Sequence, residues 1–437
     1  MEDEILSPEE CKILEDDGIL LRSHNGRRKI SKSYLSSSLV PSASPSNDEF
    51  PGHNEISRTA TVQYHRTRAS QDIDFSEQVR SLAALKFIGL NHETAKDIWN
   101  RWSSRPDPMD NPDDLMDYVY SHTCNLWRAA WSVYTDEDAL EKLGVAKWLQ
   151  KAILDPRSRD IYLTGTLKRW LDDSLRTNFN SLVRIHKQLK AYPTLRGNGK
   201  EQKRSSLGNM DSENRHLPKP HVCVTTAPPS ILPGHEVFYK AMHPDEIESG
   251  EDPFISQDGA INMRAIRAYL GGDFNPTNPA WYWTPEHETA LAYKTYAEIR
   301  KPFGEVWIIC IQVPTAFIST LRKKELWYSH DWKAYVWHCH KQHDEDSIPE
   351  RYHPYFVPGQ TQTDLIIGHI CKKDGTVITK IPADKVQSTM SQDNILLIGD
   401  QKATQWVIMH RDVANRLGRE IRGKVHVDVY KAKEDEK

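Results

Sequence analysis

The segment AWYWTPEHETALAYKTYAE (280–298) carries the side chains with the clearest chemical use. We expect a short aromatic strand over 281–284 and a helix over 285–299, which places Tyr282 on the strand and Tyr293 about two turns into the helix. From these positions the two rings can face each other across a slot. Two facing rings suit a flat aromatic ligand, held by stacking and by exclusion of water. The same spacing also fits two ordinary core aromatics.

A turn-rich loop, GGDFNPTNP (271–279), comes directly before this strand. Its glycine, asparagine and proline residues favour a rigid connection, and loops of this kind often line the mouth of a pocket. Asp273 and Asn275 are therefore candidates for contact with a ribose or a substrate. The alternative is a plain connector with no ligand.

The strand and helix around Tyr282 and Tyr293 resemble a region of ADP-ribosyltransferases of the poly(ADP-ribose) polymerase and diphtheria-toxin type. In that family a Y-F-A tripeptide on a strand and a second tyrosine on the next helix sandwich the nicotinamide of NAD. Tyr282 matches the first tyrosine, Trp283 the residue after it, and Tyr293 the second. The resemblance covers roughly residues 235–430.

Two further elements of that family follow the same order in this chain. The first core strand corresponds to FYKAM (238–242), with Lys240 where the family has His or Arg. The late strand that carries the family's catalytic glutamate corresponds to TQWVIM (404–409), with Gln405 in the glutamate position. Glutamine keeps a hydrogen bond to ribose but brings no charge. Loss of a preorganised electrostatic group costs about 10²–10³ in rate.

The resemblance implies an NAD-binding protein that acts as a mono-ADP-ribosyltransferase or an NAD glycohydrolase. Gln405 would take the catalytic position. The residues implied to bind NAD are Lys240, Tyr282, Thr284, Tyr293 and Asp273. The alternative is a catalytically inactive module of the same fold that binds a nucleotide-like ligand or a protein partner. Each position also has an ordinary interpretation: a strand-edge lysine for Lys240 and a solvent-facing strand residue for Gln405.

A second candidate site is the histidine-rich stretch WHCHKQH (337–343). On a strand predicted over 333–340, His338 and His340 would share one face, as metal ligands can. No third and fourth ligands stand at motif spacing, so we expect no metal site. Nucleophile elbows, cysteine-protease signatures and the common nucleotide-binding glycine motifs are absent from the sequence.

Composition restricts the class of protein. The chain has 437 residues, 27% of them charged, with a net charge of −4, which gives no nucleic-acid footprint. No apolar run has the length of a membrane span, so we expect no membrane association. Six scattered cysteines and an acidic N-terminus without an apolar stretch favour the cytosol or nucleus.

The chain divides into four predicted parts. Residues 1–75 form a disordered Ser/Pro-rich tail, 76–190 a helical domain, 191–230 a linker, and 231–437 an α+β domain with mostly antiparallel sheets. The strands predicted in the last part are 236–242, 281–284, 305–313, 333–340, 364–371, 376–381, 394–399, 404–409 and 424–430.

The helical domain shows apolar residues at helical spacing. Ala95, Ile98 and Trp99 follow Asn91, a predicted N-cap, and a capping box is expected at Thr135. No catalytic constellation occurs here. A protein partner bound through residues 76–190 is therefore the function expected of this domain.

Overall fold

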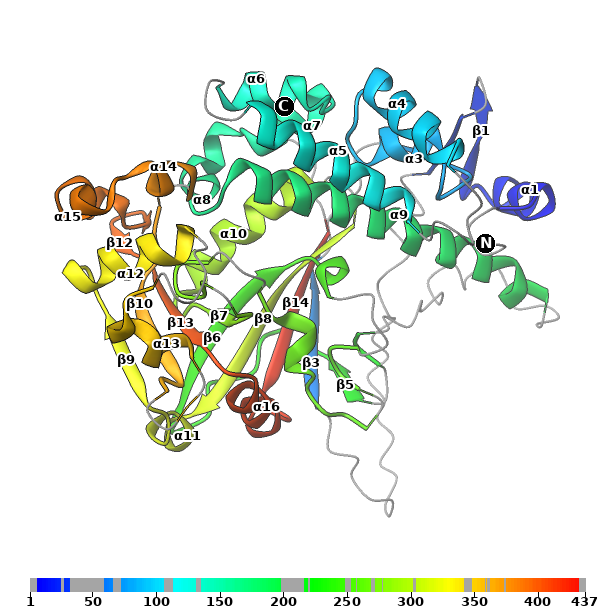
Figure 1. Cartoon of the computed structure of the whole chain (residues 1–437). Helices are drawn as coiled ribbons and strands as arrows, with labels where there is room; N and C mark the ends of the chain where they lie inside the picture. The colour runs from blue at the N-terminus through cyan, green and yellow to red at the C-terminus, as the bar shows by residue number, and fades with distance from the viewer. Residues whose placement is uncertain are drawn as a thin grey trace, which may run out of the picture.

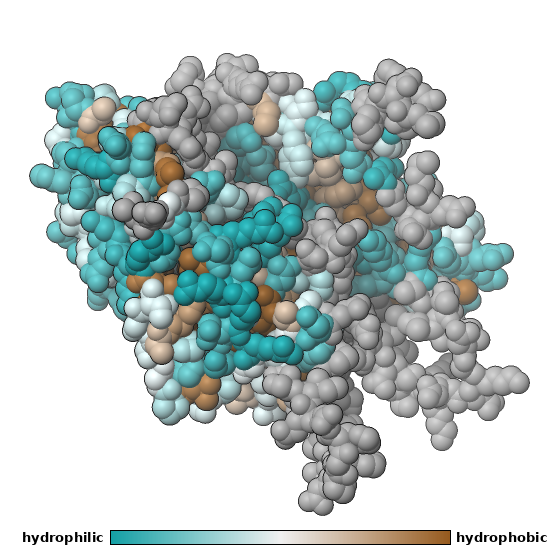
Figure 2. Space-filling view, turned by 60° about the horizontal axis from the view of Figure 1, so that its bottom comes forward, coloured by the Kyte–Doolittle hydropathy of each residue, from teal (hydrophilic) through white to brown (hydrophobic). Residues whose placement is uncertain are grey.

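The computed structural model describes residues 6–24, 27–31, 59–65, 72–105, 113–130, 135–197, 216–218, 221–247, 253–256, 258–268, 272–276, 278–301, 304–341, 348–357, 359, 362–372 and 375–431. These residues form an α+β fold in which helices cover two central β-sheets (Figure 1). None of the helices in these ranges is long and apolar enough to cross a membrane. On the face shown in Figure 2 the surface is mostly hydrophilic, with apolar residues in separate small patches.

The larger sheet has five strands in the order β5-β3-β14-β8-β6. Their bounds are Val222–Val224 for β5, Ala60–His65 for β3, Val425–Lys431 for β14, Glu305–Pro314 for β8 and His235–Met242 for β6. The second sheet has the order β7-β13-β10-β9, with bounds Trp281–Trp283, Thr404–Ile408, Leu365–His369 and Lys323–Leu326. Most pairings are antiparallel, as predicted, but β5–β3, β3–β14 and β10–β9 are parallel.

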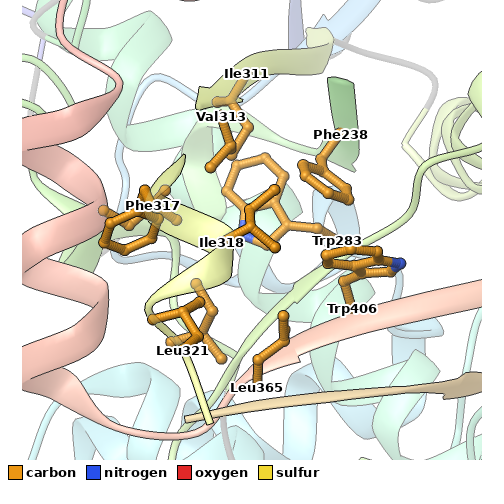
Figure 3. Close-up of a pocket in the computed structure, with 11 residues that line it drawn as sticks. Phe238, Trp283, Ile311, Val313, Phe317, Ile318, Leu321, Leu365 and Trp406 are labelled. Carbon is orange, nitrogen blue, oxygen red and sulfur yellow. The ribbon is translucent and has the colours of Figure 1, made fainter. Parts of the chain in front are cut away.

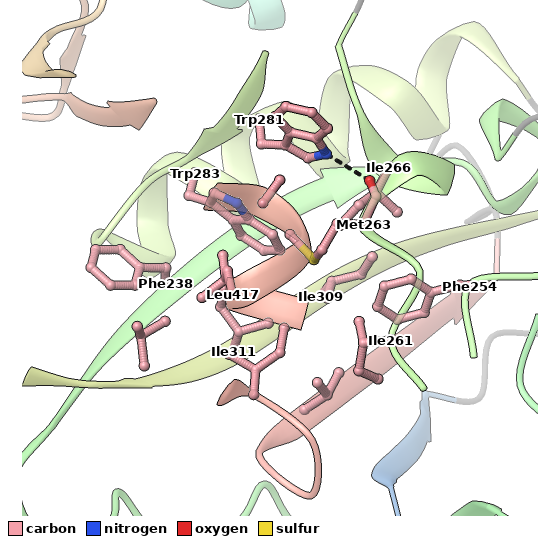
Figure 4. Close-up of a cluster of buried hydrophobic side chains, with 14 of the residues drawn as sticks. Phe238, Phe254, Ile261, Met263, Ile266, Trp281, Trp283, Ile309, Ile311 and Leu417 are labelled. Atoms are coloured by element: carbon pink, nitrogen blue, oxygen red, sulfur yellow. Dashed lines mark hydrogen bonds between the residues drawn. The ribbon is translucent and has the colours of Figure 1, made fainter. Parts of the chain in front are cut away.

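The two sheets enclose the largest core, which we call the inter-sheet core (Figure 4). Alternate strand residues supply it because successive side chains of a strand point to opposite faces. Trp281 and Trp283 enter it from β7, and Ile309 and Ile311 enter it from β8. The Trp281 indole N–H donates to the Met263 carbonyl oxygen at 2.6 Å, so this large ring is buried without an unsatisfied donor.

A layer of helices lies above the five-stranded sheet (Figure 1). It comprises α3 (Leu82–Phe87), α4 (His92–Ser103), α5 (Leu115–Ala130), α6 (Asp136–Lys142), α7 (Lys147–Ile153), α8 (Arg159–Tyr162) and α9 (Leu167–Gly197). The N-cap predicted at Asn91 is confirmed, since its side chain accepts from the Thr94 N–H at 2.9 Å. At Thr135 only half of the predicted capping box forms: the Thr135 hydroxyl accepts from the Asp138 N–H at 3.2 Å, but the Asp138 carboxylate accepts from that hydroxyl and not from the Thr135 N–H. We call the apolar centre of this layer the helical core.

Helix α10 (His287–Arg300) joins the helical layer to the sheets. It contacts β6 and β8 on one side and α7 and α8 on the other. Tyr296 on α10 is fully buried in the helical core, where its ring meets Trp170 edge-on at 5.1 Å. The helical and α+β parts therefore share a packed boundary.

The prediction that residues 1–75 lack regular structure is wrong for the part of this stretch that the structure describes. Helix α1 (Pro8–Asp16) and strands β1 (Leu20–His24), β2 (Arg27–Ile30) and β4 (Ile73–Phe75) pack against α9. Strand β3 lies inside the five-stranded sheet, with Ala60 and Val62 buried. The alternation of apolar and polar residues in ATVQYH was hidden by its Ser/Pro-rich surroundings. The predicted linker also contributes a strand, β5.

Further helices are α11 (Thr315–Ser319), α12 (His330–Lys341), α13 (His353–Phe356), α14 (Gly375–Lys380), α15 (Val386–Thr389) and α16 (Arg411–Glu420). Helices α11 and α16 contact β8 of the larger sheet, and α12 contacts α14 and α15. Two of these helices, α12 and α14, were predicted as strands, at 333–340 and 376–381. In α12 the buried residues Trp332, Tyr335, Val336 and Cys339 recur with helical spacing, which outweighs their strand propensity. In α14 Ile378 is buried and the adjacent Val377 is exposed, so only one face of this helix is turned toward the core.

Two other elements are short. After β6 the chain makes a single 3₁₀ turn, Pro244–Glu246. The strand predicted over 394–399 is reduced to β11 (Leu397–Ile398), which pairs with β12 (Gln401–Lys402). Short 3₁₀ turns also occur at Pro156–Ser158, Met263–Ile266, Glu350–Tyr352, Ala383–Lys385 and Gln392–Asn394.

Candidate functional site

A buried aspartate, Asp273, is the centre of the candidate site. It is 6% exposed, and three elements converge on its carboxylate. His340 Nε2 of α12 lies 2.8 Å from Oδ1. The other oxygen, Oδ2, accepts from the backbone N–H of Cys371, just after β10, and from the Gln405 side-chain amide of β13, each at 2.8 Å. Asp273 and Gln405, both predicted as site residues, are therefore in direct contact.

Strand alternation directs Gln405 toward Asp273. Trp406 faces the inter-sheet core, and Gln405 faces the opposite side of the four-stranded sheet. Opposite Gln405 in the register is Gly368 of β10. A Cβ at Gly368 would lie 2.3 Å from a β9 carbonyl oxygen and 2.8 Å from the Phe274 ring. The glycine thus lets Phe274 lie against the sheet, which holds the neighbouring Asp273 beside Gln405.

The two ends of the Gln405 amide have different surroundings. Its nitrogen donates to Asp273 and to the His369 carbonyl oxygen, the latter at 3.1 Å. Its carbonyl oxygen has no hydrogen-bond partner among the residues that the structure describes. The nitrogen is fixed, and the oxygen is available to an incoming donor.

The Tyr282 hydroxyl is hydrogen-bonded to the loop that carries Asp273. Its hydroxyl donates to Asn275 Oδ1 at 2.6 Å and accepts from the Phe274 N–H at 3.0 Å. A Cβ at Gly272 would lie 2.3 Å from this hydroxyl, so the loop needs glycine at that point. Burial raises the pKa of Tyr282 well above its ordinary value, and the Asp273 carboxylate adds to the effect. Tyr282 is a neutral hydrogen-bonding group at physiological pH.

Tyr293 reaches the helical layer from α10. Its hydroxyl donates to Thr164 Oγ1 at 3.0 Å, and its half-buried ring packs against the helical core. Burial raises the pKa of Tyr293 to about 12, and the Asp273 carboxylate acts in the same direction. Asp273 therefore lies within electrostatic range of this second tyrosine as well.

The structure does not bring the rings of Tyr282 and Tyr293 into contact. Tyr282 packs against the apolar cluster around α12, which we call the α12 core, and Tyr293 packs against the helical core. Both hydroxyls are influenced by the same two charges, the Asp273 carboxylate and the Arg169 guanidinium. The packing of the two rings against different cores gives no support to the predicted nicotinamide sandwich, and Asp273 is the one carboxylate that affects both hydroxyls.

Lys240 lies on β6, separate from the Asp273 contacts. Burial lowers the pKa of its ammonium group, although the nearby Glu246 carboxylate raises it. Burial also raises the pKa of Glu246, and Asp173 of α9 adds to that rise. The Lys240 ammonium makes no hydrogen bond or ion pair within the described residues. Lys240 and Glu246 are therefore a pair of perturbed charges at the boundary of the two parts, as is common at functional sites.

Thr284 has a local structural role. Its hydroxyl donates to the Glu286 carboxylate at 2.5 Å, and its backbone bridges Tyr239 of β6. Glu286 also accepts from the Thr404 N–H at 3.2 Å. These contacts join β6, β7 and β13 at the point where α10 begins. Thr284 is 7% exposed, and its hydroxyl is already hydrogen-bonded to Glu286.

The histidines of WHCHKQH do not share a face as predicted. They lie on α12, where residues two apart point in different directions. His338 contacts the rings of Trp337 and Tyr352, whereas His340 meets Asp273. His343 lies outside the described residues. The sequence pattern singled out His340 but gave no signal for Cys371.

His340 does have potential co-ligands from elsewhere in the chain. One ligand atom each from Asp273, His340 and Cys371 lie within 4.8 Å of one another. The Cys371 thiol is 1% exposed, and the His340 side chain is 5% exposed. Carboxylate, imidazole and thiol groups together are a donor set that divalent transition metals accept.

A separate apolar pocket opens off the inter-sheet core. Figure 3 shows side chains of β6, β8, β13 and α11 turned toward one another there, among them Phe238, Ile311, Phe317 and Trp406. Its volume is about 20 Å³, room for about one water molecule. This pocket is too small and too apolar for a nucleotide, so it does not compete with the Asp273 region.

Comparisons with known proteins identify no relative. No protein-family model matches the chain, no curated protein matches it, and no solved structure matches its fold. The functional interpretation therefore depends on the geometry of the site and on the motifs in the sequence.

Proposed function

We propose that the protein binds NAD or a closely related nucleotide beside Asp273 and Gln405, without efficient transfer of ADP-ribose. The observation that carries this proposal is the Gln405 amide. Its nitrogen is fixed by Asp273 and by the His369 carbonyl oxygen, and its own oxygen has no hydrogen-bond partner in the described part of the chain. A ribose hydroxyl can donate to that oxygen.

The surroundings of Gln405 suit the rest of the nucleotide. Tyr282 and Tyr293 are half-buried aromatic groups whose pKa values are both raised in part by the Asp273 carboxylate, and either ring is a candidate to stack on nicotinamide. Lys240, on β6, makes no hydrogen bond or ion pair within the described residues, and burial lowers the pKa of its ammonium group although the nearby Glu246 carboxylate raises it. A diphosphate beside it would stabilise the charged form, so Lys240 gains more from an anionic ligand than an exposed lysine would.

The same residues disfavour turnover. Cleavage of the nicotinamide–ribose bond develops positive charge on the ribose, which a preorganised anion stabilises. The Gln405 amide is neutral. Loss of such a group costs about 10²–10³ in rate, so binding without measurable transfer is the expected behaviour.

The test is proton NMR of NAD mixed with the full chain. We expect broadening of the nicotinamide proton lines and no free nicotinamide over several hours, compared with a sample lacking protein. Release of nicotinamide would overturn the absence of turnover. Unchanged lines at protein concentrations near that of NAD would overturn the binding site itself.

A pair of variants locates the ligand. Tyr293→Ala should reduce the broadening, because stacking on an aromatic ring contributes about 1–3 kcal/mol per ring. Tyr118→Ala is the matched control, since Tyr118 is also half-buried, lies on a helix and packs against the same helical core. Equal effects of the two substitutions would assign the loss to folding, and no effect of Tyr293→Ala would remove Tyr293 from the site.

A second candidate, mono-ADP-ribosyl transfer or NAD hydrolysis, is favoured by Asp273. Its carboxylate lies 2.8 Å from the Gln405 nitrogen and supplies a negative charge next to the neutral amide. In this case the native chain releases nicotinamide and Asp273→Asn stops the release. If the first proposal holds instead, the double variant Asp273→Asn, Gln405→Glu exchanges amide and carboxylate across their hydrogen bond and should gain release.

A further inference from the structure

The cluster of Asp273, His340 and Cys371 combines three side chains from separate elements. Asp273 comes from the loop before β7, His340 from the last turn of α12, and Cys371 from the chain just after β10. Their ligand atoms lie within 4.8 Å of one another. All three side chains are almost entirely shielded from solvent. This arrangement is independent of any nucleotide beside Gln405.

The negative charge of the Asp273 carboxylate has no permanent cation beside it within the described residues. Within the described ranges no lysine or arginine pairs with Asp273, whose partners are an imidazole, a backbone N–H and a side-chain amide. A buried carboxylate of this kind is costly unless a cation lies beside it. Either a protonated His340 or a bound metal ion provides that cation.

The hydrogen bonds orient the carboxylate for a metal. Oδ2 of Asp273 accepts both the Cys371 N–H and the Gln405 amide, so it is held in place. Oδ1 faces His340 Nε2 alone, at 2.8 Å. Outer contacts that fix one oxygen while the other faces the ligand site are the usual support of metal ligands.

The distances are near those that a metal requires. Ligand atoms around a tetrahedral zinc ion stand about 3.3–3.6 Å apart, given its bond lengths to nitrogen, oxygen and sulfur. The Oδ1–Nε2 separation of 2.8 Å would open by about half an ångström, and the thiol would approach by about an ångström at most. Side-chain rotation is sufficient for both changes.

We propose that Asp273, His340 and Cys371 bind one divalent transition-metal ion, with Zn²⁺ as the cation that suits this donor set. On binding, the Cys371 thiol loses its proton to solvent, and the hydrogen of neutral His340 resides on Nδ1 so that Nε2 can coordinate. Asp273 Oδ1 supplies the third bond. The fourth position is left to water.

The test uses the full chain stripped of metal with a chelator and titrated with Co²⁺. We expect one equivalent to bind, with the visible bands of tetrahedral cobalt and a near-ultraviolet thiolate-to-cobalt charge-transfer band. Added Zn²⁺ should bleach both. Absence of these bands, or binding without the charge-transfer band, would overturn the proposal.

Substitutions distinguish the proposed metal ligands from neighbouring residues that do not bind the metal. Cys371→Ser should remove the charge-transfer band, and His340→Gln should weaken Co²⁺ binding by at least about tenfold. Cys339→Ser is the matched control, because Cys339 is buried in the same α12 core one residue before His340. Unfolding of each metal-free variant by urea shows whether it is folded. A folded Cys371→Ser chain that keeps the band, or a Cys339→Ser chain that loses it, would contradict the assignment.

The metal content of the purified chain also distinguishes two roles of Asp273, as a metal ligand and as the anion that the second functional candidate needs. A bound cation would neutralise the carboxylate that the second functional candidate needs as an anion. Metal analysis of the purified chain therefore bears on that candidate, whereas NAD binding at Gln405 and Tyr293 is measured without reference to the metal. Failure of one proposal leaves the other intact.

Discussion

Two buried aspartates, Asp245 and Asp273, are stabilised by opposite means. Asp245 is paired with the Lys301 ammonium and with Arg184, whose Nε lies 3.3 Å from Oδ1, and it accepts from the Ser181 hydroxyl at 2.9 Å. Among the residues that the structure describes, the partners of Asp273 are an imidazole and two amide donors. The Asp245 carboxylate is neutralised by cationic side chains of the protein, whereas the Asp273 carboxylate has no such ion pair within the described residues.

This difference distinguishes two kinds of cluster. The contacts of Asp245 with Arg184, Lys301 and Ser181, which we call the joint, hold the fold together, whereas Asp273 is the centre of the candidate site. Burial alone would raise the pKa of Asp245, but Arg184 and Lys301 outweigh burial and hold that pKa well below its usual value. This cluster fastens α9 to the end of β6 and leaves nothing for a ligand to supply. The Asp273 cluster lacks a permanent cation, so a ligand or metal can contribute there.

The largest expected effect comes from breaking the joint. Asp245→Ala should lower the free energy of unfolding by about 3–5 kcal/mol, because it leaves the buried Lys301 without its partner. Urea unfolding followed by circular dichroism measures this loss. Asp97→Ala is the control, since the pair of Asp97 with Arg101 is exposed and worth about 0.5 kcal/mol or less. Equal losses would mean that Asp245 is not a structural joint.

The joint also predicts a dependence of stability on pH. Burial, with the Lys301 charge in support, lowers the pKa of His243 to about 3. His243 therefore stays neutral in the folded chain but gains a proton on unfolding below about pH 6.5, its ordinary pKa. Its contribution to stability is complete above that pH and is lost as pH falls toward 3, by about 2–3 kcal/mol between pH 7 and 4.5.

His243→Gln should remove this contribution, measured as the difference in urea unfolding between the variant and the native chain at pH 7, 6, 5 and 4.5. The Glu246 carboxyl, whose pKa burial raises to about 7, contributes in the opposite direction in both chains. The Asp245 carboxyl does not interfere, because its lowered pKa shows its effect only below its unfolded value of about 3.9. An unchanged slope in the variant would assign the pH dependence to other groups.

The Asp273 cluster should be less costly to alter. Asp273→Asn removes the charge but keeps an oxygen acceptor, so the free energy of unfolding should fall by about 1–3 kcal/mol. The comparison of the two aspartates is sharpened by Asp245→Asn, which should cost more because it leaves Lys301 and Arg184 facing a neutral group. The reverse order, read from the same urea curves, would contradict the distinction between joint and site.

The smallest effect is expected at Tyr293. Tyr293→Phe removes only the hydrogen bond to Thr164, which is worth about 0.5–1.5 kcal/mol of stability. Because the aromatic ring remains, broadening of the nicotinamide lines by the protein should persist. Loss of that broadening with unchanged thermal stability would mean that the hydroxyl, and not the ring, contacts the ligand.

Much of the fold could be predicted from local patterns. Strands β6, β8, β13 and β14 follow the alternation of apolar residues, and α4 follows its cap at Asn91. Helix α12 was mistaken for a strand because KAYVWHCH is rich in residues that favour strands. Its burial pattern is helical, and packing outweighs propensity when the two disagree.

The candidate site could be predicted only in part. Asp273, Tyr282 and Gln405 were singled out, and they do lie together. The Asp273 partner His340 is 67 residues from Asp273, and Cys371 is 98 residues from it. No spacing rule connects ligands brought together from such distances by separate elements. Contacts of this kind become visible only once the sheets have been assembled.

The position of β3 has a consequence for the order in which the chain matures on the ribosome. Its neighbours are β14 and β5, and the His65–Asp428 contact across β3 and β14 spans 363 residues. At translation rates of about 5–20 residues per second, β3 waits about 20–70 s after synthesis before β14 exists. During that interval β3 lacks a permanent neighbour on that edge, so the nascent chain is the form most dependent on chaperones.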